Sequence, residues 1–319
     1  MARYILLRIA QAIPTLAFLV ILTFVVVRIT PGDPAYAIAG DNASADYIAH
    51  VRVAYGLDKP VLEQLWLYVS HLIVGDLGTS YTYHSPVLGV VMGRLGASLL
   101  LVACGLVLGI VGGTYLGAYA SRIKGTLREA ILNFASLTLY SVPIFWLGLL
   151  LIYVFAIKAN LVPAGGIHSL PPPTGFAATL DLLDHLALPT LTLALYTFPV
   201  YYRLTRSRMS AVMNDEYIRT ARAIGFAERR VFFRHGLRNA ILPSLTMAGL
   251  TIGQSIGGAL LTEAVFAWPG VGTLMQEAIG QRDLPLIMGV FIVVAISVLV
   301  ATIVTDVLYV VADPRVRLS

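Results

Sequence analysis

Residues 95–121 read LGASLLLVACGLVLGIVGGTYLGAYAS and contain no Asp, Glu, Lys or Arg. A helix needs about 20 mostly apolar residues to cross the ~30 Å hydrocarbon core of a bilayer. Backbone polar groups find no partners in lipid, so a run of this length and composition predicts a membrane-spanning helix. The stretch therefore predicts an integral membrane protein.

The composition of the 319 residues supports this prediction. Hydrophobic residues make up 58% of the chain and charged residues 12%, whereas soluble domains carry about 25% charged residues. A soluble fold of this size could not bury so much apolar surface. The composition excludes an ordinary cytoplasmic enzyme, a disordered chain and a disulfide scaffold, and the one cysteine, Cys104, cannot form an internal disulfide.

Five further stretches lack acidic and basic residues and are long enough to span a bilayer. They are residues 9–27, 130–157, 185–202, 239–262 and 284–305. Residues 307–312 extend the last stretch beyond Asp306, and we expect Asp306 to serve at a helix end. Nothing in the chain has the short alternating segments of a membrane barrel. We therefore predict an all-α polytopic membrane protein with six transmembrane helices.

The distribution of basic residues predicts the orientation. Six spans place both termini on one side, and most of the 22 Lys and Arg residues lie on that side, including a dense group between Arg203 and Arg238. Positively charged loops stay in the cytoplasm, so both termini are expected to be cytoplasmic. The net charge of +5 is then a signal of topology rather than of nucleic-acid binding.

The loops on the other side differ in character. Residues 28–94 form an acidic loop in which Pro60 is suited to open a helix. One face of that helix is apolar, and it comprises Val61, Leu62, Leu65, Trp66 and Val69. The face is typical of a helix that lies on the membrane or caps the bundle, and alternatively of a docking surface for an external partner.

The second external loop, residues 158–184, is rich in proline and is expected to be irregular. His168 and His185 flank it. Because no other ligands cluster with them, we interpret both as ordinary loop residues and expect no metal site.

The third external loop contains the sequence EAVFAWPGVG at residues 263–272, followed by an amphipathic segment at 273–279. Trp is common at membrane interfaces. A Pro-Gly break at membrane depth lines a cavity or is buried in protein. We therefore hypothesise that part of this loop forms an external gate, and we call its residues Glu263, Phe266, Trp268, Pro269 and Gly270 the external gate segment.

The loop between the fourth and fifth spans predicts a helix, a glycine turn and a second helix. Asn214 or Asp215 is suited to cap the first helix. Gly225 stands where a helix ends in the left-handed conformation. Thr220, Ala221 and Ala223 give the first helix small side chains, which would let its tip enter a groove of another protein closely.

This loop resembles the EAA signature of integral-membrane subunits of ABC importers. The triplet falls on Arg219-Thr220-Ala221, Gly225 takes the place of the motif glycine, and the ending Ile-Leu-Pro follows at residues 241–243. The motif glutamate is absent. The version Arg-Thr-Ala-Arg-Ala-x-Gly, followed by Glu228-Arg229-Arg230, is similar to the peptide and nickel importer subfamily, although Ile224 stands where that subfamily often has Lys.

Three other stretches resemble the same subfamily, so the resemblance covers essentially the whole chain. They are the Pro-Gly-Asp-Pro sequence at 31–34, residues 263–272 and the ending at 306–315. The chain looks like the B-type, first permease subunit of dipeptide and oligopeptide importers.

The resemblance implies the type I ABC importer permease fold in a bacterial plasma (inner) membrane. It implies a second permease subunit in a heterodimer, two cytoplasmic ATP-binding subunits and an external substrate-binding protein. Residues 1–94 would hold the first span and an external loop, residues 95–312 a five-helix core with a coupling loop at 203–238, and residues 313–319 a cytoplasmic tail. The residues expected to dock the ATPase are Arg219, Thr220, Ala221, Arg222, Ala223, Gly225, Glu228, Arg229 and Arg230.

The chain is not expected to be an enzyme or to hold a cofactor. It contains neither Gly-Lys-Ser nor Gly-Lys-Thr, so it has no P-loop for ATP phosphates. The predicted function is half of the translocation pathway of an ATP-driven importer of di- or oligopeptides, with nickel or glutathione as alternative substrates. The alternative class is a gradient-driven secondary transporter or channel, for which Asp306 would be the membrane acid.

Overall fold

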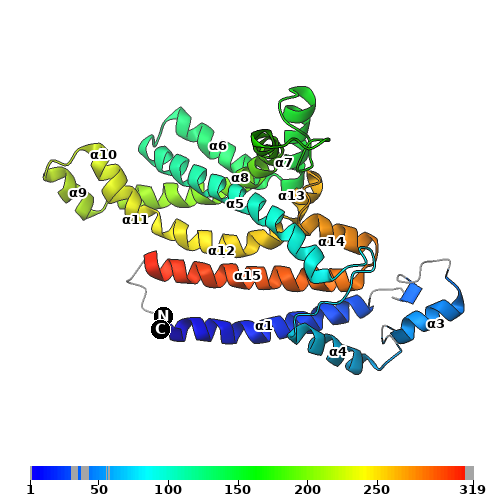
Figure 1. The fold of residues 1–319 in the computed structure, drawn as a ribbon. Helices are drawn as coiled ribbons and strands as arrows, with labels where there is room; N and C mark the ends of the chain where they lie inside the picture. The colour runs from blue at the N-terminus through cyan, green and yellow to red at the C-terminus, as the bar shows by residue number, and fades with distance from the viewer. Residues whose placement is uncertain (1, 30–34, 37–42, 55, 57, 313–319) are drawn as a thin grey trace. The chain divides into compact units, whose positions relative to one another are not determined.

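The computed structural model describes residues 2–29, 35, 36, 43–54, 56 and 58–312. Regular structure in these residues is helical (Figure 1), and a single β-bridge joins Thr79 to Pro86. The predicted all-α class is confirmed. The motif at 31–34 and the tail at 313–319 lie outside the described residues. The chain forms two compact units that divide in sequence after Ser98, after Trp268 and after Ile303.

Unit 1 contains the described residues up to Ser98 together with Pro269–Ile303. Its helices are α1 (Ala2–Ile29), α3 (Ala45–Ala54), α4 (Val61–Ile73), the first part of α5 (Val87–Arg122), α14 (Val271–Gly280) and most of α15 (Leu284–Ala312). Pro60 occupies the N-cap of α4 with φ −54°, one residue before the position predicted for it. The amphipathic segment predicted at 273–279 is the body of α14.

Unit 2 contains Leu99–Trp268 and the end of α15. Its other elements are α6 (Leu127–Ser141), α7 (Ile144–Leu151), the π-helix η1 (Ile152–Lys158), α8 (Phe176–Val212), α9 (Glu216–Ala223), α10 (Glu228–Arg230), the π-helix η2 (Val231–Leu237), α11 (Arg238–Ala240), α12 (Leu242–Gly258) and α13 (Leu260–Val265). Within this unit, α9 and α10 lie at one end and α7 and α13 at the opposite end (Figure 1).

Three helices of the described chain are long and apolar enough to cross a membrane: Val87–Arg122, Phe176–Val212 and Leu284–Thr305. They contain the predicted spans 95–121, 185–202 and 284–305. The predicted span 9–27 lies in α1, whose apolar stretch Ala10–Val26 is shorter.

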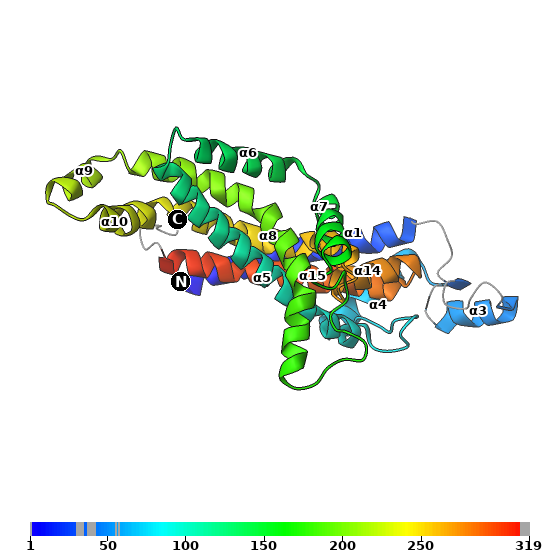
Figure 2. The same ribbon diagram turned by 90° about the horizontal axis from the view of Figure 1, so that it is seen from above.

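The prediction of one continuous helix at 130–157 is wrong. α6 and α7–η1 are long and apolar enough to cross a membrane only when taken together, and the chain bends by 110° between them. Figure 2 shows the two helices running in different directions. Pro143 has no N–H to donate the next hydrogen bond of the helix, and a residue before proline is disfavoured at helical φ and ψ angles. Val142 accordingly has φ −84° and ψ 129°, and the chain turns there.

Two other predicted boundaries differ from the structure. α8 begins at Phe176, so the last third of the loop predicted to be irregular at 158–184 is helical. The stretch predicted as one span at 239–262 is divided among α11, α12 and α13, with turns at Ile241 and Ala259 whose backbone stays in the right-handed helical region. Pro243, in the first turn of α12, removes a backbone donor next to the first of these breaks.

A stripe of glycines joins α5 to α8 inside unit 2. A Cβ added to Gly105 would lie 2.6 Å from Leu193 Cβ, one on Gly109 2.8 Å from the Ala194 carbonyl oxygen, and one on Gly113 2.6 Å from the Phe198 carbonyl oxygen. Gly117 approaches the Tyr202 carbonyl in the same way. The four-residue spacing puts these glycines on one face, where small residues let membrane helices pack backbone to backbone.

A buried carboxylate holds unit 1 together at the start of α15. Asp283 is fully buried. Its Oδ2 accepts hydrogen bonds from Ser80 Oγ at 2.6 Å and from the Thr82 backbone N–H at 2.9 Å, while Oδ1 accepts one from the Leu286 N–H at 3.2 Å. Asp283 therefore caps α15 and fixes the loop between α4 and α5.

Asp283→Ala is expected to destabilise the protein by about 3 kcal/mol, because several buried donors lose a charged acceptor together. Tyr83→Phe is the matched control: it removes one bond to Glu277, of 2.6 Å, from a partly exposed site, and should cost no more than about 1 kcal/mol. The measurement is the thermal midpoint of the purified protein in detergent. Equal shifts for the two variants would contradict the structural role of Asp283.

Candidate functional site

The segment predicted to be helix, glycine turn, helix has that structure. We call residues 215–238, which comprise α9, α10 and η2, the α9–α10 segment. Asp215 occupies the N-cap of α9, as predicted, but its side chain makes no capping hydrogen bond. Asn214 instead donates from Nδ2 to the Ser210 carbonyl at 2.9 Å.

Gly225 ends α9 in the left-handed conformation, with φ +90°. The Gly225 N–H donates to the Arg222 carbonyl at 2.9 Å, and the Phe226 N–H donates to the Ala221 carbonyl at 3.2 Å. This pair of bonds is a Schellman motif. A Cβ on Gly225 would meet nothing within 4 Å, so glycine is required by the backbone angle and not by lack of space.

A small apolar core lies within the segment. Ile218, Ala221 and Val231 are buried together, and Met213 and Phe226 pack against them. Ala221 is therefore buried within the segment, where it would support a docking surface rather than contact a partner directly, and its docking role stays a prediction. Ile218 and Ala221 are three residues apart and share the face that packs on η2.

The other predicted docking residues lie on the surface of the segment. They are Arg219, Thr220, Arg222, Ala223, Gly225, Glu228, Arg229 and Arg230. Arg222 Nε lies 2.8 Å from Glu228 Oε1; both side chains are largely exposed, so this pair contributes at most about 1 kcal/mol. The Arg230 guanidinium lies 4.5 Å from the centre of the Phe226 ring, an attractive cation–π geometry.

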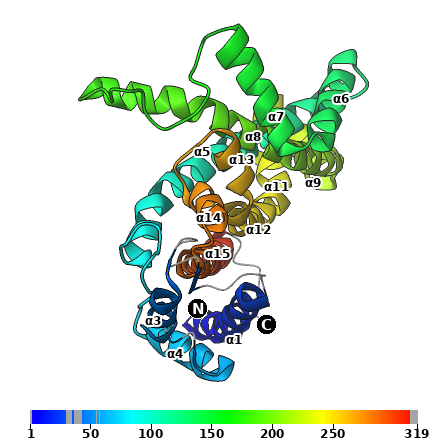
Figure 3. The same ribbon diagram turned by 90° about the vertical axis from the view of Figure 1, so that its right-hand side faces the viewer.

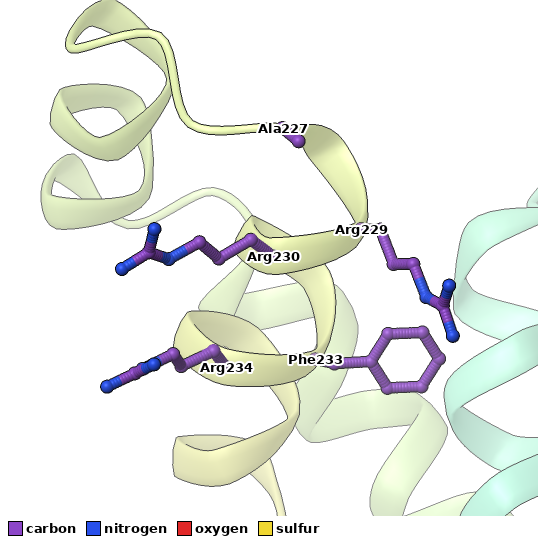
Figure 4. A pocket seen from close by; sticks show the side chains of 5 residues that line it. All are labelled: Ala227, Arg229, Arg230, Phe233 and Arg234. Atoms are coloured by element: carbon purple, nitrogen blue, oxygen red, sulfur yellow. The ribbon is translucent and has the colours of Figure 1, made fainter.

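Positive charge gathers around an open groove of about 500 Å³ in the second half of the segment. Its lining residues are Ala227, Arg229, Arg230, Phe233 and Arg234. Figure 4 shows Arg230 and Arg234 pointing to one side of the helix and Arg229 and Phe233 to the other. No lining residue is acidic, and Phe233 adds an aromatic ring.

The external gate segment is split between the units. Glu263, Phe266 and Trp268 belong to unit 2 and are almost fully buried. Pro269 and Gly270 belong to unit 1, where Gly270 is the N-cap of α14. The role of these five residues as a gate stays a prediction.

Phe266 fixes the end of α13 by packing and by its backbone. Its ring lies in a core with Leu147, Leu151 and Leu188. Its carbonyl accepts a hydrogen bond of 2.8 Å from the Gly166 N–H.

α13 ends in a second Schellman motif, with Ala267 at φ +46° in the position that usually holds glycine. The Trp268 N–H donates to the Glu263 carbonyl at 2.9 Å, and the Ala267 N–H donates to the Ala264 carbonyl at 3.3 Å. A left-handed residue with a Cβ persists only where its surroundings determine the backbone. Phe266 and Trp268, on either side of Ala267, are both buried, and this burial fixes the backbone at Ala267.

Sequence reasoning missed a pair of charged residues that joins α6 to α8. Arg206 Nε donates to Glu129 Oε1 at 2.9 Å, and the Gly125 N–H donates to Glu129 Oε2 at 2.6 Å. The pattern Thr126-x-x-Glu129 is a capping-box signal, and Thr126 Oγ1 accepts from the Glu129 N–H at 3.3 Å. The bond to Arg206 had no signal in the sequence, because it joins residues 77 apart.

His168 and His185 both contact Asp181. His168 Nδ1 lies 3.2 Å from Asp181 Oδ2, and His185 Nδ1 lies 2.8 Å from the Asp181 carbonyl oxygen. Ser169 also donates to this carboxylate, from Oγ at 2.5 Å. Asp181 therefore fastens the loop before α8 to that helix.

Apolar helices long enough to cross a membrane define a polytopic membrane protein, and the arginine-rich α9–α10 segment follows one of them, α8. The family described as "Binding-protein-dependent transport system inner membrane component" matches residues 105–318. Its N-terminal counterpart, "Binding-prot-dependent transport system membrane comp, N-term", matches residues 1–102. The chain belongs to this family of ABC-importer permease subunits, which are not themselves catalytic.

Several relatives match over nearly their full length. The oligopeptide transport system permease protein AppB of Bacillus subtilis is 36% identical, covering 99% of this chain and 100% of that one. The dipeptide transport system permease protein DppB of Escherichia coli is 35% identical, covering 99% of each. A putative peptide permease protein of Brucella ovis is 38% identical over 100% of both chains.

A solved structure has the same fold. It is the MetNI methionine ABC transporter in an inward-facing conformation, with a TM-score of 0.55 and 16% identity over 70% of this chain and 96% of that chain. The predicted type I importer permease fold is therefore confirmed.

Proposed function

We propose that this chain forms half of the translocation pathway for di- or oligopeptides in an ATP-driven importer. The observation that carries the proposal is the full-length similarity, at 35–38% identity, to proteins named as dipeptide and oligopeptide permeases. The pathway would be completed by a second permease subunit, and an external binding protein would deliver the peptide. Nickel and glutathione remain alternative substrates.

The proposal assigns ATP hydrolysis to two separate cytoplasmic subunits. These would bind the α9–α10 segment through its exposed residues, with Ala221 supporting the segment from within. The orientation that this requires, with both termini in the cytoplasm, agrees with the distribution of Lys and Arg along the chain. The external gate segment would then lie on the opposite side of the membrane.

Ala223→Trp tests the docking assignment. Ala223 is exposed, so the substitution should leave the segment folded but obstruct a close-fitting partner, and overpacking commonly costs about 1–3 kcal/mol. We expect at least about fivefold weaker retention of the ATP-binding subunits, with a matching loss of ATP-dependent uptake of a labelled dipeptide in proteoliposomes.

The control is Ala49→Trp, which makes the same change at an exposed residue of α3, outside the coupling loop at 203–238. It should retain the ATP-binding subunits normally. Normal retention and uptake for Ala223→Trp would contradict the docking assignment. Dipeptide uptake that stops when the proton gradient is collapsed while ATP is maintained would instead favour a gradient-driven transporter.

A further inference from the structure

α4 packs beside α1 in unit 1 but is covered on one side only. The Tyr68 ring stacks on Phe24 of α1, with ring centroids 6.3 Å apart. Figures 1 and 3 both show α4 alongside the C-terminal part of α1. α4 is described along its whole length, and none of its residues is fully buried. This argues against the alternative in which α4 caps the helix bundle, because a cap would bury its apolar face.

A second apolar stripe runs along α4 beside the face that contacts α1. Leu62, Trp66, Val69 and Ile73 follow one another at intervals of four, three and four residues, which places them in one line on a helix. Leu62 is 81% exposed, Trp66 69% and Ile73 78%. Contiguous apolar side chains of this size on a surface mark a contact with lipid or with another protein.

The opposite arc carries the polar residues of the helix, Glu63, Gln64, Ser70 and His71, together with Leu67. Lys59 Nζ lies 2.8 Å from Glu63 Oε1, and His71 Nδ1 lies 2.9 Å from Asp76 Oδ2. A helix with one apolar and one polar arc lies in the plane of a membrane interface. Trp is the residue favoured at that depth, because its ring is amphipathic.

The neighbouring surface of α1 indicates what covers the stripe. Ile21, Leu22, Val25 and Val26 of α1 are each between 41% and 56% exposed. α1 contains the predicted span 9–27, and Phe24, which contacts α4, lies near the end of that span. The exposed apolar side chains of α1 and α4 therefore both lie near the C-terminal end of the predicted span in α1, where the interface between bilayer and water is expected.

We propose that α4 is an interfacial helix whose stripe Leu62, Trp66, Ile73 is immersed in the acyl chains at the C-terminal end of α1. Lys59, Glu63 and His71 face water. With cytoplasmic termini this is the outer leaflet. The proposal does not depend on the transported solute, so its test is independent of peptide transport.

The experiment measures the surroundings of single nitroxide labels in the full chain, reconstituted with its accompanying subunits in nanodiscs of phosphatidylethanolamine and phosphatidylglycerol. Labels are attached to Leu62→Cys and Ile73→Cys in a Cys104→Ala background, with Glu63→Cys and His71→Cys as matched controls on the same helix. Collision rates are recorded with oxygen, which concentrates in lipid, and with a water-soluble nickel chelate.

Oxygen collisions should exceed nickel collisions several-fold at positions 62 and 73, with the reverse at positions 63 and 71. Dominant nickel collisions at 62 and 73 would overturn the proposal in favour of a water-exposed face. Labels at 62 and 73 that are immobilised and shielded from both reagents would overturn it in favour of a protein partner. The four positions are exposed or at the helix surface, so labelling should leave the fold intact.

Discussion

Gly113→Ala is expected to destabilise the protein, whereas Gly112→Ala, one residue earlier, is expected to stabilise it. The new Cβ at position 113 would lie 2.6 Å from the Phe198 carbonyl oxygen and 2.9 Å from Tyr201 Cβ, so α5 and α8 would have to separate. At Gly112 a new Cβ meets nothing within 4 Å. The first substitution should cost about 1–3 kcal/mol by overpacking, and the second should contribute about 0.5–1 kcal/mol by relieving the entropic cost of glycine in a helix.

The measurement is the thermal midpoint of unfolding and the amount of folded protein in detergent extracts of membranes that contain equal amounts of each variant. Opposite signs are the expected result, because the two substitutions add the same methyl group to adjacent positions of one helix. Gly109→Ala should behave like Gly113→Ala, since its Cβ would lie 2.8 Å from the Ala194 carbonyl oxygen. Equal effects at 112 and 113 would show that α5 and α8 do not pack through this stripe.

The membrane class was predictable because the bilayer imposes a constraint that acts along the sequence. Each run without charges must satisfy its own backbone, and composition alone reveals this. The start of the last span at residue 284 coincides with the start of α15, where Asp283 supplies a charge and a cap. The bend at Pro143 was less visible, because membrane helices often contain proline without breaking.

Contacts between distant segments were not predictable from one sequence. The sequence shows a four-residue spacing in Gly105, Gly109, Gly113 and Gly117, but this spacing does not indicate that α8 is the helix they pack against. Asp283 bonds to a serine 203 residues away, and a lone acid beside Arg282 looks like any loop residue. Such contacts depend on how the chain is arranged in three dimensions.

The α9–α10 segment contains one feature that the sequence predicts and one that it does not. The conformation of Gly225 was predictable, because a glycine after a short helix has a known local use. The burial of Ala221 was not predictable, because η2 of the same chain, rather than a partner protein, packs over it. Its small side chain fits the internal core with Ile218 and Val231, and Ala221→Asp would act by disrupting the segment itself.

Gly225→Val is expected to uncouple transport, and Gly225→Asn is expected to be much milder. At φ +90° a β-branched residue is a strong outlier, whereas Asn is enriched in left-handed conformations. Strain of about 1–3 kcal/mol in the turn would reduce the population with the observed geometry by about 5- to 150-fold. Both side chains enter open space, so the difference between them reports backbone conformation rather than crowding.

The measurement is retention of the ATP-binding subunits and ATP hydrolysis stimulated by peptide-loaded binding protein, for variants at matched membrane abundance. The turn holds α9 relative to α10, and both carry exposed arginines that are proposed to contact one partner, so a changed angle moves Arg219 and Arg222 away from Arg229 and Arg230. Gly225→Val should lose both readouts while its level in the membrane stays normal, because the substitution lies outside the membrane-spanning helices. Equal losses for the valine and asparagine variants would mean that the side chain itself obstructs the partner. Wild-type values for both would mean that the geometry of this turn plays no part in coupling.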